Sequence, residues 1–309
     1  MRSRTIQLVV LLMVGLLTPV FLAQEADATD FDSVLKLARE GDVEAQLTLG
    51  SMYYEGIGIQ QNHAEAFKWI RLAAEQGSEP AQLNLGIMYA NGDGIPQNDA
   101  ESAKLFQLLA EQGSVEIQIA LGILYQYGGR VHQDNEESLK WYRLAAEQGD
   151  AGAQSLLGSI YSNGVIVKKN SEEAAKWYRL AADQGDALAQ WSLGGMYADG
   201  DGVEKDPVQA LKWIRLAAMQ GDEFAQFLLG NMYLDGTDVP SDYVKAYAWF
   251  NLATMSSNDS SFRDIAEEGM TPDQITEAQQ LSSELYSKII ATQGTSDQPP
   301  KQRRTPDPE

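Results

Sequence analysis

The chain lacks cysteine altogether: none occurs among its 309 residues. This absence excludes disulfide bonds, thiolate metal sites and a cysteine nucleophile. Histidine is almost absent as well, because His63 and His132 are the only two. Neither has another histidine or a carboxylate at the spacing of a recognisable metal motif. We therefore expect no metal site and no cofactor, and we expect both histidines to be exposed polar side chains.

Basic residues are few relative to acidic ones. The chain has 23 lysine and arginine residues against 44 aspartate and glutamate residues, for a net charge of −21. A nucleic-acid partner needs clustered cations that neutralise phosphates. The acidic balance therefore argues against nucleic acid as a partner and against docking on anionic lipid. It favours partners that are neutral or basic.

Long apolar runs are missing except for one at the N-terminus. Arg2 and Arg4 precede an apolar run over residues 6–22, and Ala-Asp-Ala at 26–28 offers a small-x-small cleavage site. This order is typical of a secretory signal peptide, which we assign to residues 1–28. The exported protein would then be periplasmic or secreted, with no membrane contact after cleavage. An uncleaved membrane anchor is the alternative, although the run is barely long enough to span a bilayer.

What the chain has in abundance is repetition. The stretch KWYRLAAEQGDAGAQ begins at Lys140, and close copies begin at Lys176 and Lys212, each 36 residues further on. A shorter copy begins at Lys68. Extending this period gives six repeats, and a fixed period of this length is the signature of a repeat architecture. The repeats span residues 41–76, 77–112, 113–148, 149–184, 185–220 and 221–256.

Each repeat reads as two helices joined by a loop. In the first repeat Gly41 suits the position just past a helix end, and Asp42 caps the helix that follows. Asn62 is the N-cap of the second helix, and Glu65 stands three residues on as its capping-box partner. Five of the six repeats carry such a box. The sequence therefore predicts a helix-loop-helix unit.

Two positions of the repeat indicate how its helices pack. Gly50 recurs in every first helix, and a helical glycine, which costs about 1 kcal/mol relative to alanine, implies that another helix comes close. We interpret the tryptophans of the second helices as core residues, because they repeat in register with the apolar face. They are Trp69, Trp141, Trp177, Trp213 and Trp249. Neither helix buries its apolar face alone, so stacked repeats must share one core and the fold is predicted to be all-α.

The pattern A-x-x-x-L-G-x-M-Y-x-x-G, a loop, and then A-x-K-W-[YI]-R-L-A-A-x-Q-G resembles the Sel-one-like repeat (SLR) family, a relative of the tetratricopeptide repeat. The resemblance covers residues 41–256. It implies a right-handed α-solenoid, and the family's members mostly act as non-catalytic binding scaffolds or adaptors in signalling complexes. Bacterial members are often secreted or periplasmic. On this resemblance we expect a protein or peptide partner in the cell envelope, in a signalling or envelope-assembly complex.

Both ends of the array resemble the family's caps. Residues 29–40, which include FDSVLKLARE, are predicted to be a single helix that covers the first repeat. Residues 257–291 are predicted to be a linker and a terminal helix, in which Thr271 is the N-cap and Gln274 its capping-box partner. Two helices per repeat and one at each end make about fourteen. Residues 292–309, rich in Gly, Ser, Gln, Pro and mixed charge, are predicted to be a disordered tail.

One motif suggests a catalytic alternative. Ser33 and Lys36 match the S-x-x-K pattern of penicillin-recognising enzymes, and some cysteine-rich SLR proteins are described as β-lactamases. No S-D-N or K-T-G motif accompanies the pattern, and the cysteines are missing. We therefore predict a protein without catalytic residues and keep a β-lactamase-like hydrolase as the alternative.

The predicted binding site lies where the repeats differ on their exposed face. By resemblance to tetratricopeptide proteins, the first helix of each repeat lines the concave groove. Large apolar residues gather there in repeats five and six, and they are the expected anchors: Leu188, Trp191, Phe224, Phe227 and Leu234. Polar residues accompany them in repeats four to six: Ser155, Ser159, Asn163, Asp199, Asn231 and Asp235. The alternative is that the apolar side chains are buried against the terminal helix or a neighbouring repeat.

Overall fold

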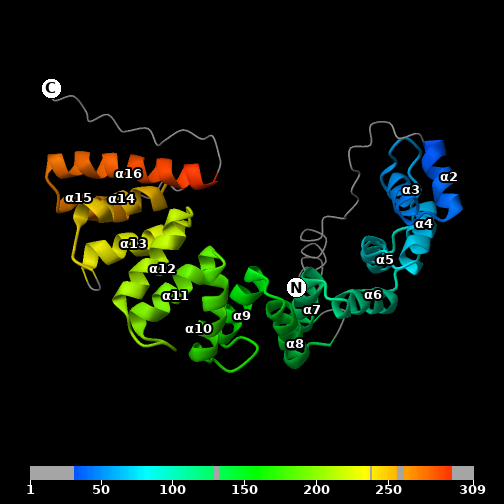
Figure 1. Cartoon of the computed structure of the whole chain (residues 1–309), viewed down its shortest axis with the longest axis horizontal. Helices are drawn as coiled ribbons and strands as arrows, with labels where there is room; N and C mark the ends of the chain where they lie inside the picture. Colours follow the sequence, from blue (N-terminus) through cyan, green and yellow to red (C-terminus); the bar gives the residue numbers. More distant parts are fainter. Residues whose placement is uncertain (1–30, 129–131, 237–238, 256–260, 294–309) are drawn as a thin grey trace. The chain divides into compact units, whose positions relative to one another are not determined.

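The structure is a computed structural model that describes residues 31–128, 132–236, 239–255 and 261–293. Over these ranges it contains fifteen helices and no strand, which confirms the all-α prediction (Figure 1). The predicted signal peptide, and all but the first two residues of the predicted tail, lie outside the described residues.

Contacts within the chain divide it into two compact units, and the division falls after Gln148, between the third and fourth repeats. The first compact unit holds α2 (Phe31–Glu40), α3 (Val43–Glu55), α4 (His63–Glu75), α5 (Glu79–Asn91), α6 (Asp99–Glu111), α7 (Val115–Tyr127) and α8 (Asn135–Glu147). The second holds α9 (Ala151–Asn163), α10 (Ser171–Asp183), α11 (Ala187–Asp199), α12 (Pro207–Met219), α13 (Glu223–Asp235), α14 (Tyr243–Ala253), α15 (Ser261–Glu268) and α16 (Pro272–Gln293).

The predicted N-caps of the repeat helices are confirmed. Asp42 accepts a hydrogen bond at 2.7 Å from the backbone N–H of Ala45 at the start of α3. Asn62 does the same for the first turn of α4, where it accepts from Glu65 at 3.1 Å. Ser114 is an exception, because its side chain makes no capping hydrogen bond to α7. Short polar side chains thus satisfy backbone donors that a helix start leaves without an intrahelical partner.

The capping boxes of the second helices, in contrast, are only half made. The backbone N–H of Asn62 donates at 2.8 Å to the carbonyl of Tyr53, not to Glu65, because the loop brings the N-cap back beside the first helix. Glu65 pairs instead with Lys68 at 2.5 Å. The same backbone bond forms at the N-caps of the other second helices: Asn98, Asp134, Asn170, Asp206 and Asp242. The prediction of complete boxes in these helices was therefore wrong.

The repeat glycine of each first helix lies against a large side chain of the second helix. A Cβ atom on Gly50 would lie 2.5 Å from Ile70, which is closer than real side chains approach. The residue that fills the gap is the one after the tryptophan position. The pairs are Gly50–Ile70, Gly86–Phe106, Gly122–Tyr142, Gly158–Tyr178, Gly194–Ile214 and Gly230–Phe250. The close approach predicted from the helical glycines is confirmed in all six repeats.

The tryptophans of the second helices form part of the core to different degrees. Trp141, Trp213 and Trp249 are buried, with at most 5% of each exposed. Trp69 and Trp177 are only half-buried. The core interpretation is therefore confirmed for three of the five, and the residue that follows each tryptophan is the more completely enclosed in the first and fourth repeats, at Ile70 and Tyr178.

A glutamine ladder explains why the phrase around E-Q-G-D…A-Q repeats, and in each pair the first-helix glutamine is buried and the second-helix glutamine is exposed. Gln190 donates from Nε2 to the carbonyl of Ala182 at 3.2 Å, and its Oε1 accepts from Gln220 at 2.8 Å. The glutamine–glutamine bond recurs at 2.8 Å in three other repeats: Gln76–Gln46, Gln148–Gln118 and Gln184–Gln154. A buried amide is costly unless its hydrogen bonds are made, so the ladder specifies how successive helices align.

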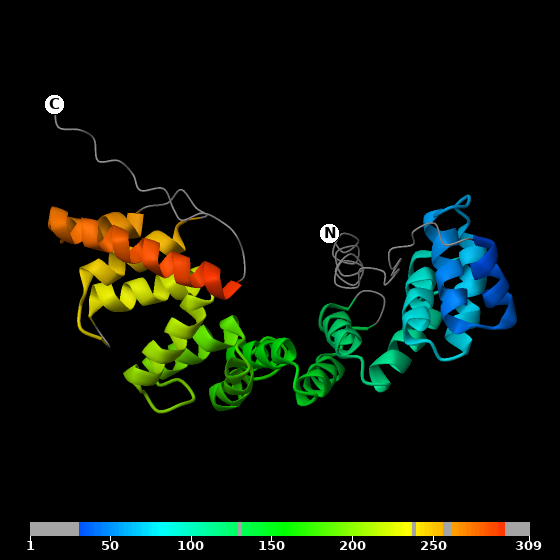
Figure 2. The ribbon, with the colours of Figure 1, turned by 45° about the horizontal axis from the view of Figure 1, so that its top comes forward.

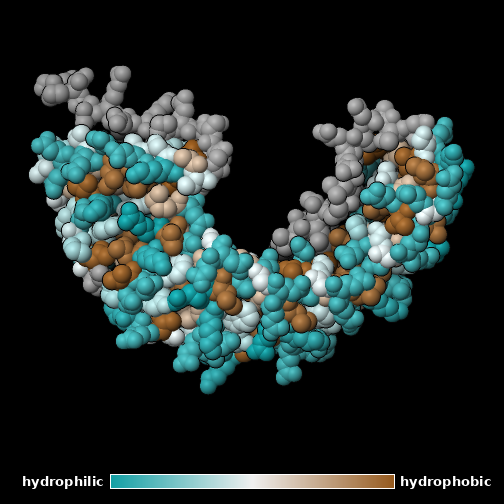
Figure 3. All heavy atoms as spheres, viewed as in Figure 1, coloured by the Kyte–Doolittle hydropathy of each residue, from teal (hydrophilic) through white to brown (hydrophobic). Residues whose placement is uncertain are grey.

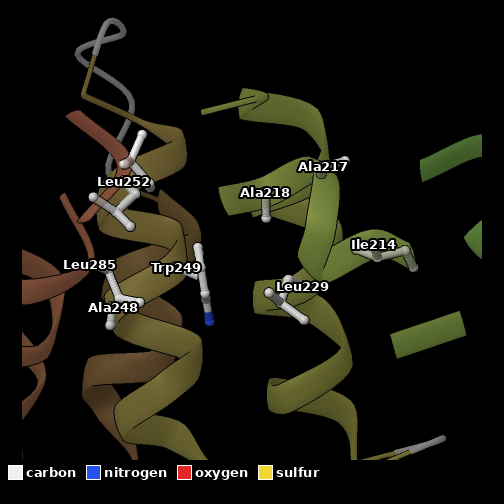
Figure 4. Close-up of a cluster of buried hydrophobic side chains, with 10 residues drawn as sticks. Ile214, Ala217, Ala218, Leu229, Ala248, Trp249, Leu252 and Leu285 are labelled. Atoms are coloured by element: carbon white, nitrogen blue, oxygen red, sulfur yellow. The ribbon is translucent and has the colours of Figure 1, made fainter. Parts of the chain in front are cut away.

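The C-terminal cap consists of two helices instead of the single one predicted. α16 begins at the complete capping box that the sequence predicts, since Thr271 and Gln274 exchange hydrogen bonds of 2.9 and 3.3 Å. Leu285 and Ile289 of α16 join a buried cluster with residues of α12, α13 and α14 (Figure 4). α15 is the additional helix, and it lies in the predicted linker next to α14 (Figure 2). Its Ala266 is fully buried.

None of the helices within the described residues combines the length and the apolar character needed to cross a bilayer.

Candidate functional site

Three of the predicted anchors form an open apolar surface on the first helices of repeats five and six. Leu188 on α11 is 43% exposed and Phe224 on α13 is 49% exposed. Trp191 is half-buried, and its ring meets that of Phe224 at 65° with the centroids 4.7 Å apart. Trp191 also packs against the buried cluster of Figure 4, which holds it in place. We call Leu188, Trp191 and Phe224 the aromatic face.

The other two predicted anchors belong to a different cluster. The ring centroid of Phe227 lies 4.7 Å from that of Phe262 on α15 and 5.9 Å from that of Phe250 on α14. Leu234 packs against the same group. We call Phe227, Phe250 and Phe262 the terminal cluster. The prediction that all five anchors share one open surface was therefore wrong: Phe227 and Leu234 are half-buried against the C-terminal region, as the stated alternative has it.

The predicted serines of repeat four take part in packing rather than in an open surface. Ser155 is 4% exposed and donates at 2.9 Å to Oδ1 of Asp186, the N-cap of α11. Ser159 donates at 3.2 Å to the carbonyl of Ser155 and accepts from the hydroxyl of Tyr178 at 3.0 Å. These bonds tie α9 to α10 and α11. Ser155 in particular has no surface with which to contact a ligand.

The remaining predicted polar residues lie on or at the ends of the first helices. Asp199 and Asp235 are the last residues of α11 and α13, and both are exposed. A helix C-terminus already carries partial negative charge, so each carboxylate adds to a negative potential instead of offsetting one. Within the described ranges neither carboxylate pairs with a lysine or arginine. Asn163 is exposed at the end of α9, and Asn231 is half-buried in the middle of α13.

Sequence reasoning missed two residues of this region. Phe262 was assigned to a linker, although Phe262, Ile265 and Ala266 have the i, i+3, i+4 spacing of a short amphipathic helix. Gly195 was also overlooked, because it follows the repeat glycine Gly194 directly. A Cβ atom on Gly195 would meet no atom within 4 Å, so Gly195 faces open space whereas Gly194 faces Ile214. The signal was a second glycine directly after the repeat glycine, which no other repeat has at that position.

The S-x-x-K motif gains no support from the structure. Ser33 and Lys36 lie one turn apart on α2, and both are exposed. A nucleophile is activated by an adjacent base in a site that excludes water, and this surface provides no enclosure. The described residues also contain no group of three or more histidine, aspartate and glutamate side chains arranged to hold a metal ion. No observation favours the hydrolase alternative.

The two histidines differ from each other, and one differs from expectation. His132 is exposed, as predicted. His63 is half-buried, and its ring stacks on that of Tyr54 with centroids 4.6 Å apart. Tyr54 in turn donates to Asp93 at 3.0 Å. Burial, and then the Asp93 carboxylate, raise the pKa of Tyr54 to about 12. This cluster joins the loop of repeat two to repeat one, which is a structural role.

A surface depression of about 640 Å³ lies away from the predicted anchors. It is formed by α10 and the loop between α11 and α12. Its charged lining is mixed, with Glu172 and Glu204 beside Lys176 and Arg179. Arg179 is already engaged, because its guanidinium lies 5.3 Å from the ring of Tyr197. A lining with both signs of charge selects no single class of ligand, so the aromatic face remains the better candidate.

Apolar residues on the visible surface of the second compact unit lie in separate patches. In Figure 3 the second compact unit shows hydrophobic patches separated by hydrophilic residues, not one continuous apolar surface. Isolated apolar residues on a surface need no explanation, but a Trp–Phe pair with a neighbouring leucine is a group.

Comparison with protein families identifies the repeats. The Sel1 repeat model matches six segments, which begin two or three residues after the boundaries set from the sequence period. They are residues 43–78, 79–114, 116–150, 151–186, 187–222 and 224–258. No curated protein matches the chain.

Two solved structures are similar over most of the chain. A Sel1 repeat protein from Oxalobacter formigenes is 31% identical, with a TM-score of 0.66 and coverage of 91% of this chain and 83% of that one. The protective antigen c5321 of uropathogenic Escherichia coli, which displays an SLR fold, is 34% identical with a TM-score of 0.63. That match covers 90% of this chain but only 62% of the antigen.

Proposed function

Because the chain belongs to the Sel1 repeat family, whose members are generally protein-interaction scaffolds and not enzymes, we propose that it binds a peptide or protein segment on the aromatic face. The observation that carries the proposal is the exposure of Leu188 and Phe224 beside Trp191. Removing apolar side chains from water lowers the free energy of the complex, and tryptophan is enriched among residues that dominate binding.

The charge around the aromatic face selects the partner. Asp199 and Asp235 end the two helices that carry the face, and the whole chain has a net charge of −21. An acidic surface speeds the encounter with a basic partner and disfavours an acidic one. The partner is therefore a neutral or basic polypeptide. Nucleic acid and anionic lipid are negatively charged, so an acidic surface repels them.

A crosslinking experiment tests the proposal. A photoreactive amino acid at Leu188 should capture the partner in cells, and mass spectrometry would identify the species. Leu216 is a matched control, because it has the same 43% exposure but lies on the second helix α12. Capture from Leu188 and not from Leu216 supports the proposal. Equal capture from both positions, or capture from Leu216 alone, contradicts it.

Alanine substitutions test how much the aromatic side chains contribute to the free energy of binding. Trp191→Ala should weaken binding of the captured partner by about 2 kcal/mol, which is the usual threshold for a residue that dominates an interface. The half-buried Trp191 also supports the core, so the melting temperature must be measured beside the affinity. Phe224→Ala, which removes a side chain that is 49% exposed, should weaken binding with almost no change in melting temperature. A loss of stability without a loss of binding in both variants would assign the face to packing.

We also propose that the protein acts after export, as a scaffold for a signalling or assembly complex of the cell envelope. The support is the order of basic residues, apolar run and small-x-small site within residues 1–28. Mass measurement of the mature N-terminus tests it. A chain that begins near Ala28 or just after it supports export with cleavage, whereas an intact Met1 in the membrane fraction supports the anchor alternative.

A further inference from the structure

The aromatic face continues along α11 into a part of the surface with small side chains. Leu188, Trp191, Gly195 and Asp199 follow one another at intervals of three or four residues, so they share one side of the helix. Leu188 and Asp199 are exposed, and the two residues between them are half-buried. The side of α11 therefore has an apolar end, a middle without a side chain, and an acidic end.

The middle of this surface allows a close approach. A Cβ atom on Gly195 would meet nothing within 4 Å, and Gly195 is not in the left-handed region that requires glycine. Neither packing nor backbone conformation explains why glycine stands in the middle of a helix, where it costs stability. Glycine is also the residue that lets the main chain of a ligand come close.

A polar group stands on the first helix of the next repeat, at Asn231. It lies on α13 at the place in repeat six that Gly195 occupies in repeat five. Its side chain is half-buried and makes no hydrogen bond with the described residues. An asparagine amide both donates and accepts, which matches the N–H and C=O of a peptide unit.

Two carboxylates define the acidic end of this surface. The carboxylates of Asp199 and Asp235 lie at the C-terminal ends of α11 and α13, and neither forms an ion pair with another described residue. Their negative charge adds to the partial negative charge of the helix ends. A lysine or arginine of a partner would be the complementary group.

We infer that the aromatic face binds an extended segment of another protein, with its apolar side chain on Trp191 and Phe224, its main chain over Gly195, and a lysine or arginine at Asp199 and Asp235. This inference rests on the proposed function and narrows its partner class. Trp191 and Asp199 are eight residues apart on a helix that rises 1.5 Å per residue, which is about 12 Å. An extended chain covers that length in about four residues. The recognised feature is therefore an apolar and a basic residue about four positions apart.

Synthetic peptides test the spacing. The probes are labelled peptides of about ten residues with one phenylalanine and one arginine, placed about four or about eight positions apart in a Gly-Ser background. Fluorescence anisotropy should show binding of the four-residue spacing that is about tenfold tighter than that of the longer spacing, and weaker at high salt. Equal affinities for the two spacings, or no binding of either, would overturn the inference.

Filling the open position tests the main-chain contact. Gly195→Ala and Gly195→Leu should keep the fold, because the added atoms enter open space and both residues are better helix formers than glycine. Binding of the four-residue peptide should fall stepwise, by about tenfold or more for the leucine variant. Unchanged binding by Gly195→Leu, in a protein whose melting temperature is preserved, would remove the main chain from this position and overturn the inference.

A charge exchange tests the acidic end. The double variant Asp199→Lys and Asp235→Lys should lose the arginine peptide and gain a peptide with glutamate in its place. Failure of this exchange would overturn the assignment of the basic residue. The Leu188 crosslink decides the proposed function separately: capture of a different protein together with failed peptide tests would leave that function standing without this inference. Capture of a second copy, or of residues 294–309 of the same chain, would overturn the inference in favour of another occupant.

Discussion

Phe224 and Phe227 lie three residues apart on α13, and their surroundings are opposite. Phe224 is 49% exposed and touches the ring of Trp191 from the preceding repeat. Phe227 is half-buried and packs against Phe250 and Phe262. The repeat pattern places both on the same side of the helix, so it predicts one surface. The difference recurs in every repeat, because the position of Phe224 is exposed and that of Phe227 is buried or half-buried. At Phe227, α15 adds a contact with Phe262.

The largest expected effect is on the helix contact beneath the terminal cluster. Gly230→Leu should lower the free energy of unfolding by more than about 3 kcal/mol, because a Cβ atom there would already lie 2.6 Å from Phe250. Chemical denaturation measures the loss. Gly195→Leu is the matched control, and its unfolding midpoint should not fall. Equal losses in the two variants would contradict the assignment of one glycine to packing and the other to the surface.

Alanine substitutions at Phe224 and Phe227 compare the contributions of the two positions to stability. Phe227→Ala should cost about 2 to 3 kcal/mol, since it opens a cavity between α13, α14 and α15. Phe224→Ala should change stability by about 0.5 kcal/mol or less, because its side chain is largely in water already. Thermal unfolding of both variants decides the matter. A larger loss for Phe224→Ala would mean that the aromatic face is part of the core.

The glutamine ladder provides a smaller, graded effect next to the aromatic face. Gln190→Ala should cost about 2 kcal/mol, because it removes the bonds to both Ala182 and Gln220. Gln82→Ala should cost about half as much, since Gln82 bonds to Ala74 but its Oε1 has no partner among the described residues. Denaturation of the two variants under the same conditions measures the ratio. Peptide binding at Trp191 should survive in Gln190→Ala below its melting temperature.

The smallest effect concerns the titration of Tyr54 in the first compact unit. Its pKa is raised to about 12 from an ordinary value of 10.0, so folding favours the protonated phenol. The stabilisation that this shift represents is fully present below pH 10.0 and is lost as the pH rises towards about 12. Tyr54→Phe should flatten the fall of stability in this window. An unchanged alkaline profile in the variant would assign the fall to other tyrosines.

Much of the fold could be predicted because each repeat position has a local cause. Asp42 and Asn62 start helices through bonds to residues two or three positions away, and Thr271 with Gln274 closes a complete box in the same way. Gly50 predicts a helix contact because glycine destabilises a helix interior and is usually found there where another helix comes close. The half-made boxes show the limit: Glu65 has the right spacing, but the N–H of Asn62 is taken by Tyr53 across the loop.

The candidate site was predicted less well because exposure is a property of neighbours. Leu188 and Trp191 could be assigned to a variable face from the sequence alone. Ser155 has the same repeat position as the half-buried Trp191, yet Ser155 is buried and donates its hydroxyl to Asp186 of the next repeat. Gly195 could not be predicted as part of the site, since only the surrounding atoms show that the space beside it is open.

The sequence by itself determined the six repeats, the helical start and stop signals, the acidic character of the chain and its membership of a repeat family. These depend on residue type and on spacing within a few turns, which the chain carries locally. Only the tertiary structure decided which side chains of the variable face stay in water. Phe224 and Phe227 are alike as residues, and they differ because the packed repeats leave the position of Phe224 in water and partly bury that of Phe227, where α15 adds Phe262.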